Sequence, residues 1–210
     1  MQKLDLRKEL KAFYAPSAKQ VEVVDVPCFQ FLMIDGAIEP GMAPGTSPGF
    51  QEAMQALYGA SYTLKFMSKQ RKEDPLDYTV MALEGLWWVE DDQFDINDKD
   101  NWYYTVMILQ PEHITREMFQ EALQKLRKKK GDQPAFGKLR LEPFHEGLSL
   151  QIMHLGPYST EPATLEKMHA FAELHGYTLH GKHHEIYMGD PMRALPQKLK
   201  TILRHSVVKG

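Results

Sequence analysis

Two runs of large apolar residues each carry one acidic residue at their centre, and they constrain the fold more than any other feature of the chain. Glu84 lies in the run 80–89, Val-Met-Ala-Leu-Glu-Gly-Leu-Trp-Trp-Val, and Glu185 lies in the run 183–188, His-His-Glu-Ile-Tyr-Met. Short runs of this composition are typical of buried strands. A carboxylate on a buried strand is costly unless it is paired, protonated or ready to contact a ligand. Both acids are therefore candidates for a functional site.

Around the first run, the residue pattern predicts the order strand, helix, strand, strand. A first strand is expected over 21–34, and a loop rich in Gly and Pro follows it. Ser47 is a good N-cap for the next helix, since Pro48 suits the first turn and apolar residues recur beyond it at helical spacing. Two further strands are expected over 78–90 and 102–110, with an acidic loop between them.

The same order recurs in the second half of the chain. Segments 138–144 and 148–155 are expected to form a hairpin. A helix is expected over 160–175, because a Gly-Pro-Tyr break precedes it and a glycine stop follows it. Strands over 183–188 and 200–207 complete the unit.

The chain is therefore interpreted as one domain, 1–210, built from half-repeats at about 20–110 and 138–207. A linking helix is expected between them, over about 115–131. The helix ends in the cationic run Arg-Lys-Lys-Lys at 127–130. Cations at a helix C-terminus oppose the macrodipole favourably, which explains the run better than a nucleic-acid patch does.

Composition narrows the class of partner. The formal net charge is −3, so the chain has no global basic field and no nucleic-acid partner is expected. No apolar run is long enough to span a bilayer and the N-terminus is too charged for a signal peptide, so no membrane partner is expected either. Cys28 is the single cysteine, which excludes an intrachain disulfide and favours a reduced, cytoplasmic setting.

The histidines near Glu185 do not predict a metal site. His183 and His184 point to opposite faces of a strand, which leaves His183 and Glu185 as an incomplete pair of ligands. The sequence also contains no Gly-rich phosphate loop after a strand and no serine nucleophile elbow. Neither a metal nor a cofactor is therefore expected.

Alternation along the two strands decides which side chains share a face. It places Trp88 beside Glu84 on one strand, and His183 and Tyr187 beside Glu185 on the other. If the halves are duplicates, the two acids occupy matching positions and line one central groove. The alternatives are a surface carboxylate paired with a nearby cation for the second acid, and a bulge at the following glycine that turns the first acid to solvent.

Three segments resemble those of stand-alone GyrI-like small-molecule-binding proteins: Glu-Gly-Leu-Trp-Trp at 84–88, Ile-Met-His-Leu-Gly-Pro-Tyr at 152–158 and Gly-Lys-His-His-Glu-Ile-Tyr at 181–187. The resemblance extends over nearly the whole chain. It implies an α+β fold in which duplicated strand-helix-strand-strand modules with pseudo-twofold symmetry form an antiparallel sheet. Two helices then cover one face, with a ligand groove between them. The family includes effector domains of multidrug-sensing regulators and hydrolases that open the cyclopropane ring of cyclopropanoid DNA-alkylating toxins.

The resemblance implies that Glu185 is the pocket acid, and the residues present suit hydrolysis of a cyclopropane conjugated to a dienone. Glu185 would take a proton from the attacking water. Glu84 would orient that water or hold a proton, and Tyr187 would donate to the developing phenolate oxygen. These three residues are the candidate catalytic groups.

Four residues are expected to bind the ligand: Trp88, Trp102, Tyr158 and His183. Trp88 shares a face with the first acid, and it is preferred to Trp87, which is expected in the core. The structural alternative stays open, since Trp102 also suits a core and Tyr158 can simply lie beside the start of the helix.

Two classes of function compete. In the first, which is preferred, the protein hydrolyses a cyclopropanoid toxin. In the second, it binds hydrophobic or cationic aromatic drugs without changing them. The 12 methionines suit a promiscuous pocket and an ordinary core equally. Either class predicts a hydrophobic aromatic small molecule as the partner, and the sequence leaves the oligomeric state open.

Overall fold

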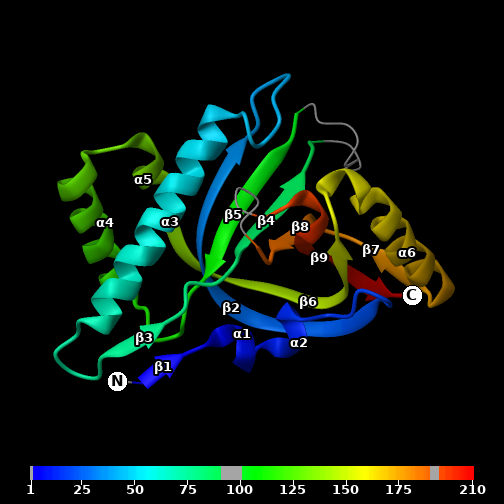
Figure 1. Cartoon of the computed structure of the whole chain (residues 1–210), viewed down its shortest axis with the longest axis horizontal. Coiled ribbons are helices and arrows are strands. Elements are labelled where there is room, and N and C mark those ends of the chain that lie inside the picture. Colours follow the sequence, from blue (N-terminus) through cyan, green and yellow to red (C-terminus); the bar gives the residue numbers. More distant parts are fainter. Residues whose placement is uncertain (1, 91–100, 190–193) are drawn as a thin grey trace.

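The computed structural model of the protein describes residues 2–90, 101–189 and 194–210. The acidic loop expected between two strands of the first half, at 91–100, lies outside the described residues. Both expected modules are present, and their strands form one antiparallel sheet (Figure 1).

The first module runs in the expected order. It consists of the elements β2 (Glu22–Ala37), α3 (Pro48–Lys69), β4 (Leu83–Trp88) and β5 (Tyr103–Leu109). Helix α3 begins where the sequence predicts, because the Ser47 hydroxyl accepts a hydrogen bond from a backbone N–H of the first turn. Strand β4 is shorter than the expected strand.

The second module repeats this order. It consists of β6 (Arg140–Leu155), α6 (Glu161–Leu174), β8 (His183–Tyr187) and β9 (Lys200–Lys209). A 3-10 turn, η1 (Tyr158–Thr160), leads directly into α6. The expected helix and its two following strands are therefore confirmed.

The expected hairpin at the start of the second module is wrong, because β6 is one continuous strand that pairs with β2 and β9. The register between β2 and β6 skips one position, where Pro27 lies opposite Glu146. Pro27 has no N–H to donate to the ladder, and the next residue after Glu146, Gly147, has a φ of +72°. Both strands bend at this point instead of reversing.

The sheet closes on itself. Its strand order is β6-β2-β5-β4-β8-β9, and β6 also pairs with β9, so these strands form a barrel. A short strand, β7 (Tyr177–Leu179), extends the sheet beside β9. One face of every barrel strand therefore points into a closed interior, and the other points outward.

Helices α3 and α6 both pack on the outer face of the barrel. From α3, the Phe50 ring lies 5.7 Å from the Trp87 ring and 5.0 Å from the Tyr104 ring, measured between centroids. From α6, Thr164 Oγ1 lies 2.9 Å from His154 Nδ1. The strand register places Trp87, Tyr104 and His154 on one face. Figure 1 shows the two helices on either side of β4 and β8.

The linking helix is also confirmed. It is α4 (Arg116–Lys130), and the Thr115 hydroxyl accepts from the backbone N–H of Met118 while Gly131 ends the helix with a φ of +80°. A short helix, α5 (Pro134–Lys138), follows it. Helix α4 packs against α3 on the side away from the barrel (Figure 1).

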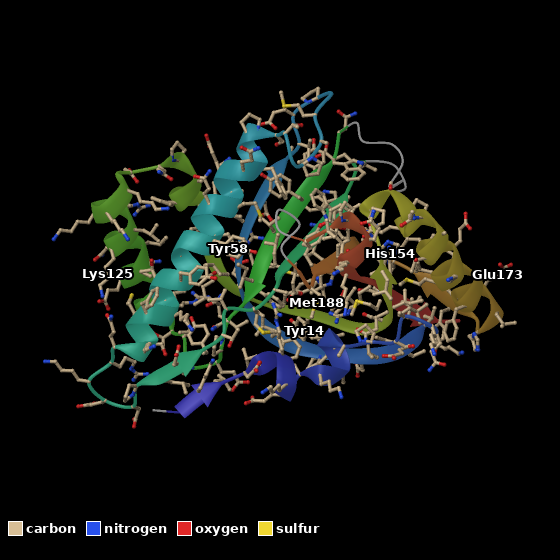
Figure 2. The ribbon with its side chains drawn as sticks, viewed as in Figure 1. Tyr14, Tyr58, Lys125, His154, Glu173 and Met188 are labelled. Carbon is tan, nitrogen blue, oxygen red and sulfur yellow. The ribbon has the colours of Figure 1, made fainter. Side chains whose placement is uncertain are left out.

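The N-terminal segment runs along the barrel from one end. It contains β1 (Gln2–Leu4), α1 (Leu6–Glu9) and α2 (Lys11–Tyr14), and β1 pairs in parallel with β3 (Leu76–Tyr78). Figure 2 shows Tyr14 near the middle of the molecule. This segment therefore contributes a side chain to the interior.

Two further observations concern the cysteine and the helices. Cys28 is exposed on β2 just after the bend. In the described part of the chain, no helix combines the length and the apolar character that crossing a bilayer requires. Lys125 on α4 and Glu173 on α6 mark opposite edges of the molecule in Figure 2.

Candidate functional site

The register between β4 and β8 separates the two acids that the sequence analysis paired. Glu84 pairs with Ile186, whereas Glu185 pairs with Gly85. Cross-strand partners point to the same face and successive residues point to opposite faces. Glu84 therefore points into the barrel and Glu185 points outward, toward the helices. The expectation that they line one groove is wrong, and the two sides are described in turn.

On the outer face, Glu185 lies among aromatic and polar side chains and is 6% exposed. Its Oε1 atom lies 3.1 Å from Nε2 of His183, the neighbour two residues earlier on the same face. The structure thus brings together the expected pocket acid and one of the expected ligand-binding residues.

Trp87 and Tyr187 lie beside this acid. The indole Nε1–H of Trp87 donates to the Tyr187 hydroxyl across a distance of 3.0 Å. Gly85 makes the approach possible, because a Cβ atom at this position would lie 2.8 Å from Trp87 Nε1 and 3.3 Å from the Tyr187 hydroxyl oxygen. Burial, and then the Glu185 carboxylate, raise the pKa of Tyr187 well above its ordinary value. The phenol is therefore kept as a proton donor.

Aromatic rings extend from this centre in two directions. Trp102 packs on Trp87 with centroids 5.6 Å apart, and Tyr158 meets Tyr187 edge-on at 6.0 Å. Tyr158 is 39% exposed, so it forms the rim, while Trp102 is 6% exposed. Burial, followed by the charges of nearby carboxylates, raises the pKa of Tyr158 to about 12. Both residues lie on the same side of the sheet as Glu185.

A second carboxyl on this face was not predicted. Glu161, the first residue of α6, is 1% exposed, and its Oε1 atom has no hydrogen-bond partner among the described residues. Burial, and then the charge of Glu185, raise the pKa of Glu161 to about 9. Acids in the first turn of a helix are common because they complement the macrodipole, so no local pattern singles out Glu161. Glu161, Glu185, His183, Tyr187 and Trp87 are called the outer cluster below.

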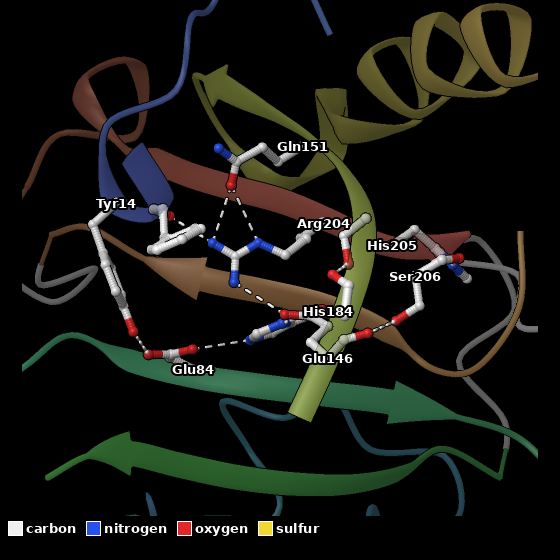
Figure 3. Close-up of polar contacts among 11 residues, drawn as sticks. Tyr14, Glu84, Glu146, Gln151, His184, Arg204, His205 and Ser206 are labelled. Atoms are coloured by element: carbon white, nitrogen blue, oxygen red, sulfur yellow. Dashed lines mark hydrogen bonds and ion pairs between the residues drawn. The ribbon is translucent and has the colours of Figure 1, made fainter. Parts of the chain in front are cut away.

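Inside the barrel, Glu84 belongs to a different set of contacts, drawn in Figure 3. Its Oε1 atom accepts a hydrogen bond of 2.7 Å from the Tyr14 hydroxyl, and its Oε2 atom lies 3.1 Å from His184 Nε2. The other ring nitrogen of His184 lies 2.8 Å from Glu146, which also accepts from Arg204 at 3.0 Å. These five residues are called the inner network.

The charges of the inner network stabilise one another. Burial alone would lower the pKa of His184, but Glu146 and Glu84 more than offset burial and raise it to about 9. Burial would likewise raise the pKa of Glu146, but His184 and Arg204 lower it to about 2. Arg204 also donates to Gln151 and to the backbone carbonyl of Phe13. Two anions and two cations are thus paired inside a closed barrel.

Trp88 follows Glu84 to the inner side of the sheet and does not reach the outer cluster. Its ring stacks on Tyr103 at 5.9 Å, and the Lys182 ammonium lies 3.2 Å from the ring centroid. Trp87 is 3% exposed and belongs to the core, as the sequence predicts, and it lies on the same face as Glu185, whereas Trp88 lies on the opposite face.

No group of three or more His, Cys, Asp or Glu side chains arranged to hold a metal ion is found in the described ranges. The outer cluster is thus defined by two carboxyls, a histidine and aromatic rings. What it offers chemically is a proton acceptor, proton donors and flat apolar surfaces on one side of a barrel.

Comparison with known proteins identifies the family. The family of GyrI-like small molecule binding domains matches residues 19–205. The chain belongs to the GyrI-like family. No curated protein matches it significantly.

Three solved structures from Listeria innocua are similar to this chain over nearly its whole length. One, an uncharacterized conserved protein, is 39% identical with a TM-score of 0.88, over 98% of this chain and all of that one. Two others, each described as a hydrolase, are also 39% identical, with TM-scores of 0.83 and 0.85 over 98% and 99% of this chain and all of theirs. As a GyrI-like domain, this protein binds small molecules, and two similar proteins are described as enzymes.

Proposed function

We propose that the outer cluster binds a flat aromatic molecule and adds water to it, by opening the cyclopropane ring of a cyclopropanoid alkylating agent. The observation that carries the proposal is the position of Glu185: a carboxylate 6% exposed, held by His183 and facing the rings that lead to Tyr158. A buried acid in such surroundings is suited to activating water.

Each residue has a distinct part in the proposed reaction. Water attacks a cyclopropane carbon, and Glu185 takes its proton. The breaking C–C bond leaves its electron pair in the conjugated ring, whose carbonyl oxygen becomes a phenolate. The Tyr187 hydroxyl, a donor at neutral pH, steadies that oxygen. His183 orients the Glu185 carboxylate from behind through their contact of 3.1 Å.

The aromatic rings around Glu185 favour a planar conjugated substrate. Trp87 and Trp102 supply rings on the side of α3, and Tyr158 supplies an edge at the rim. Offset or edge-on ring contacts favour a planar conjugated molecule over an aliphatic one. Two proteins of the same fold and 39% identity are described as hydrolases, which is in keeping with water as the second reactant.

Product analysis tests the proposal directly. The protein is incubated with a spirocyclopropyl-cyclohexadienone, and mass spectrometry follows the addition of one water. We expect catalytic formation of the ring-opened alcohol, at a rate above that in buffer. The matched control is Glu173→Gln, an exposed carboxylate at the far end of α6 that should leave the rate unchanged (Figure 2).

A carboxylate beside aromatic rings also suits a binding module, because such rings attract aromatic cations. In that case the compound is recovered unchanged, yet it raises the melting temperature of the protein, since a ligand that binds only the folded state stabilises it. Thermal protection without product would therefore replace hydrolysis by binding alone.

A further inference from the structure

Glu161 is the feature of the outer face that no expected role explains. It enters from the start of α6, while Glu185 and Tyr187 come from β8, so two separate elements bring two carboxyls to one place. Thr201 of β9 lies on the same face, and its hydroxyl lies near enough to the Glu161 carboxyl to lower the pKa of that acid. An unpartnered buried carboxyl oxygen is rare in folded proteins and points to a missing ligand.

We propose that Glu161 is a proton-holding acid that donates to the carbonyl oxygen of the bound ligand, which makes the outer cluster a site for a neutral conjugated ketone. The donation step rests on the proposed function, whereas the protonated state of Glu161 does not. Glu185 is then the charged member of the carboxyl pair and Glu161 the neutral one.

The surroundings of Glu161 keep the proton in place. The groups facing it are Glu185 and Tyr187 from β8, Tyr158 from η1 and Thr201 from β9, and none of these carries a positive charge. The N-terminus of α6 and the Thr201 hydroxyl favour the anion, but both effects are weaker than burial at 1% exposure beside a like charge. The pKa of about 9 agrees with this reasoning.

The chemistry balances without any further reactant. Water forms a C–O bond to the cyclopropane carbon and gives one proton to Glu185. The cyclopropane C–C bond breaks, its electron pair moves into the ring, and the former carbonyl oxygen takes the proton of Glu161. The product is a phenol, and the proton on Glu185 returns to Glu161 through water or the Tyr187 hydroxyl. Pairs of carboxyls whose environments separate their pKa values commonly divide the acid and base roles in this manner.

Infrared spectroscopy tests the protonated state without any ligand. The spectrum of the wild type minus that of Glu161→Gln should show, at pH 7, the C=O band of a protonated carboxylic acid. The band should disappear as the pH rises through about 9. Subtracting Glu173→Gln, whose carboxyl is exposed, should show a carboxylate instead. A carboxylate signal for Glu161 at pH 7 would overturn the proposal.

Turnover of the spirocyclopropyl-cyclohexadienone tests the donation step. Glu161→Gln keeps the shape and an N–H donor but loses the proton, so we expect kcat to fall roughly a hundredfold while KM changes little. Wild-type rates should decline above pH 9, where Glu161 loses its proton, and rates in this variant should not. An unchanged kcat in Glu161→Gln rejects the donor role. A wild type without turnover but with the carboxylic-acid band rejects the proposed hydrolysis and retains the protonated acid.

The fold of the variant is checked by thermal unfolding. Because Gln replaces a carboxyl that is neutral in the folded protein, the melting temperatures of variant and wild type should match below about pH 4.5, where the unfolded wild type is protonated as well. From there to about pH 9 the variant should become increasingly the more stable protein, since Glu161 ionises in the unfolded wild type and the folded wild type must finally bury a second anion. A melting temperature at pH 7 well below that of the wild type would mean that Glu161 is buried as an anion with a structural role, and would count against the proposal.

Discussion

The two sides of the barrel wall at β4 and β8 each hold a histidine beside a glutamate, and the two pairs have different surroundings. Outside the barrel, His183 meets Glu185 at 3.1 Å. Inside, His184 meets Glu84 at 3.1 Å. The inner pair is completed by Tyr14, Glu146 and Arg204, so that both oxygens of Glu84 have partners and the formal charges cancel. The outer pair lies beside Glu161, whose Oε1 atom has no partner within the described segments.

This difference separates a structural carboxylate from a functional one. A buried polar group with all its partners stabilises one arrangement of the chain, and removing any member leaves another member unsatisfied. A buried polar group without a partner costs stability unless something outside the protein completes it. Burial alone, which Glu84 and Glu161 share, therefore does not identify a candidate site. The Oε1 atom of Glu161, which has no hydrogen-bond partner among the described residues, is what distinguishes the outer face from the inner one.

The largest expected effect concerns turnover. Glu185→Gln removes the proton acceptor and keeps the shape, so kcat for the cyclopropanoid should fall by roughly two to four orders of magnitude. Glu84→Gln, the matched change on the inner face, should leave kcat per folded molecule within a few-fold of wild type. Steady-state kinetics on protein checked for folding measures both. Equal losses in the two variants would erase the distinction between the faces.

The next effect concerns stability, where the change at Glu84 should cost more than the change at Glu185. Glu84→Ala leaves the Tyr14 hydroxyl and a charged His184 without their partner, and breaking a buried pair of this kind costs about 3–5 kcal/mol of unfolding free energy. Urea denaturation should show this loss, with a much smaller one for Glu185→Ala. A Glu84→Ala protein within about 1 kcal/mol of wild type would show that the inner network is not structural.

The sequence predicted the strands and their faces because these depend on local pattern. Alternation correctly placed Trp88 with Glu84, and Tyr187 with Glu185. Which face of β4 matches which face of β8 depends on register, and a shift of one residue exchanges the faces. Nothing local to Glu84 specifies that register, so the paired-acid prediction failed there.

Long-range closure explains the other differences. The hairpin prediction failed at Gly147 because a glycine with positive φ occurs both in tight turns and at bends within a continuous strand. Only the pairing of β6 with β2 and β9 shows that this glycine lies at a bend. Glu161 was missed because an acid at a helix start has a local explanation. Its burial follows from how α6 lies against β8 and β9, which no pattern within α6 shows.

An intermediate effect concerns pH. The pKa of His184 is raised to about 9 in the folded protein, so its contribution is complete below its ordinary value of 6.5 and is lost as the pH rises through about 9. Glu161, with a raised pKa of about 9, adds a loss in the same direction above its ordinary 4.5. Unfolding free energy measured in urea should therefore decline from pH 6.5 to 9, by on the order of 2–3 kcal/mol for each of the two groups.

Variants assign the two parts of that decline to the two faces. Glu161→Gln should remove the outer part and retain the inner one. Adding His184→Gln should leave a nearly flat profile over this range, from a lower starting stability. A profile that stays as steep in the double variant as in the wild type would show that neither face sets the alkaline limit.

The smallest expected effect distinguishes the two neighbouring tryptophans. Trp88→Ala removes the stacking on Tyr103 and the contact with the Lys182 ammonium at 3.2 Å, which together should cost about 1–2 kcal/mol of stability. Affinity for the ligand per folded molecule should not change, because the ring lies on the inner side.

Trp87→Phe keeps a ring facing Glu185 but loses the N–H that donates to Tyr187. The loss of that hydrogen bond should weaken ligand binding by about 1 kcal/mol, roughly fivefold, with the affinity measured by calorimetric titration. Weaker binding in Trp88→Ala together with unchanged binding in Trp87→Phe would place the ligand on the inner face of the sheet. The outer face would then be the structural side, and the proposed roles of Glu84 and Glu185 would be exchanged.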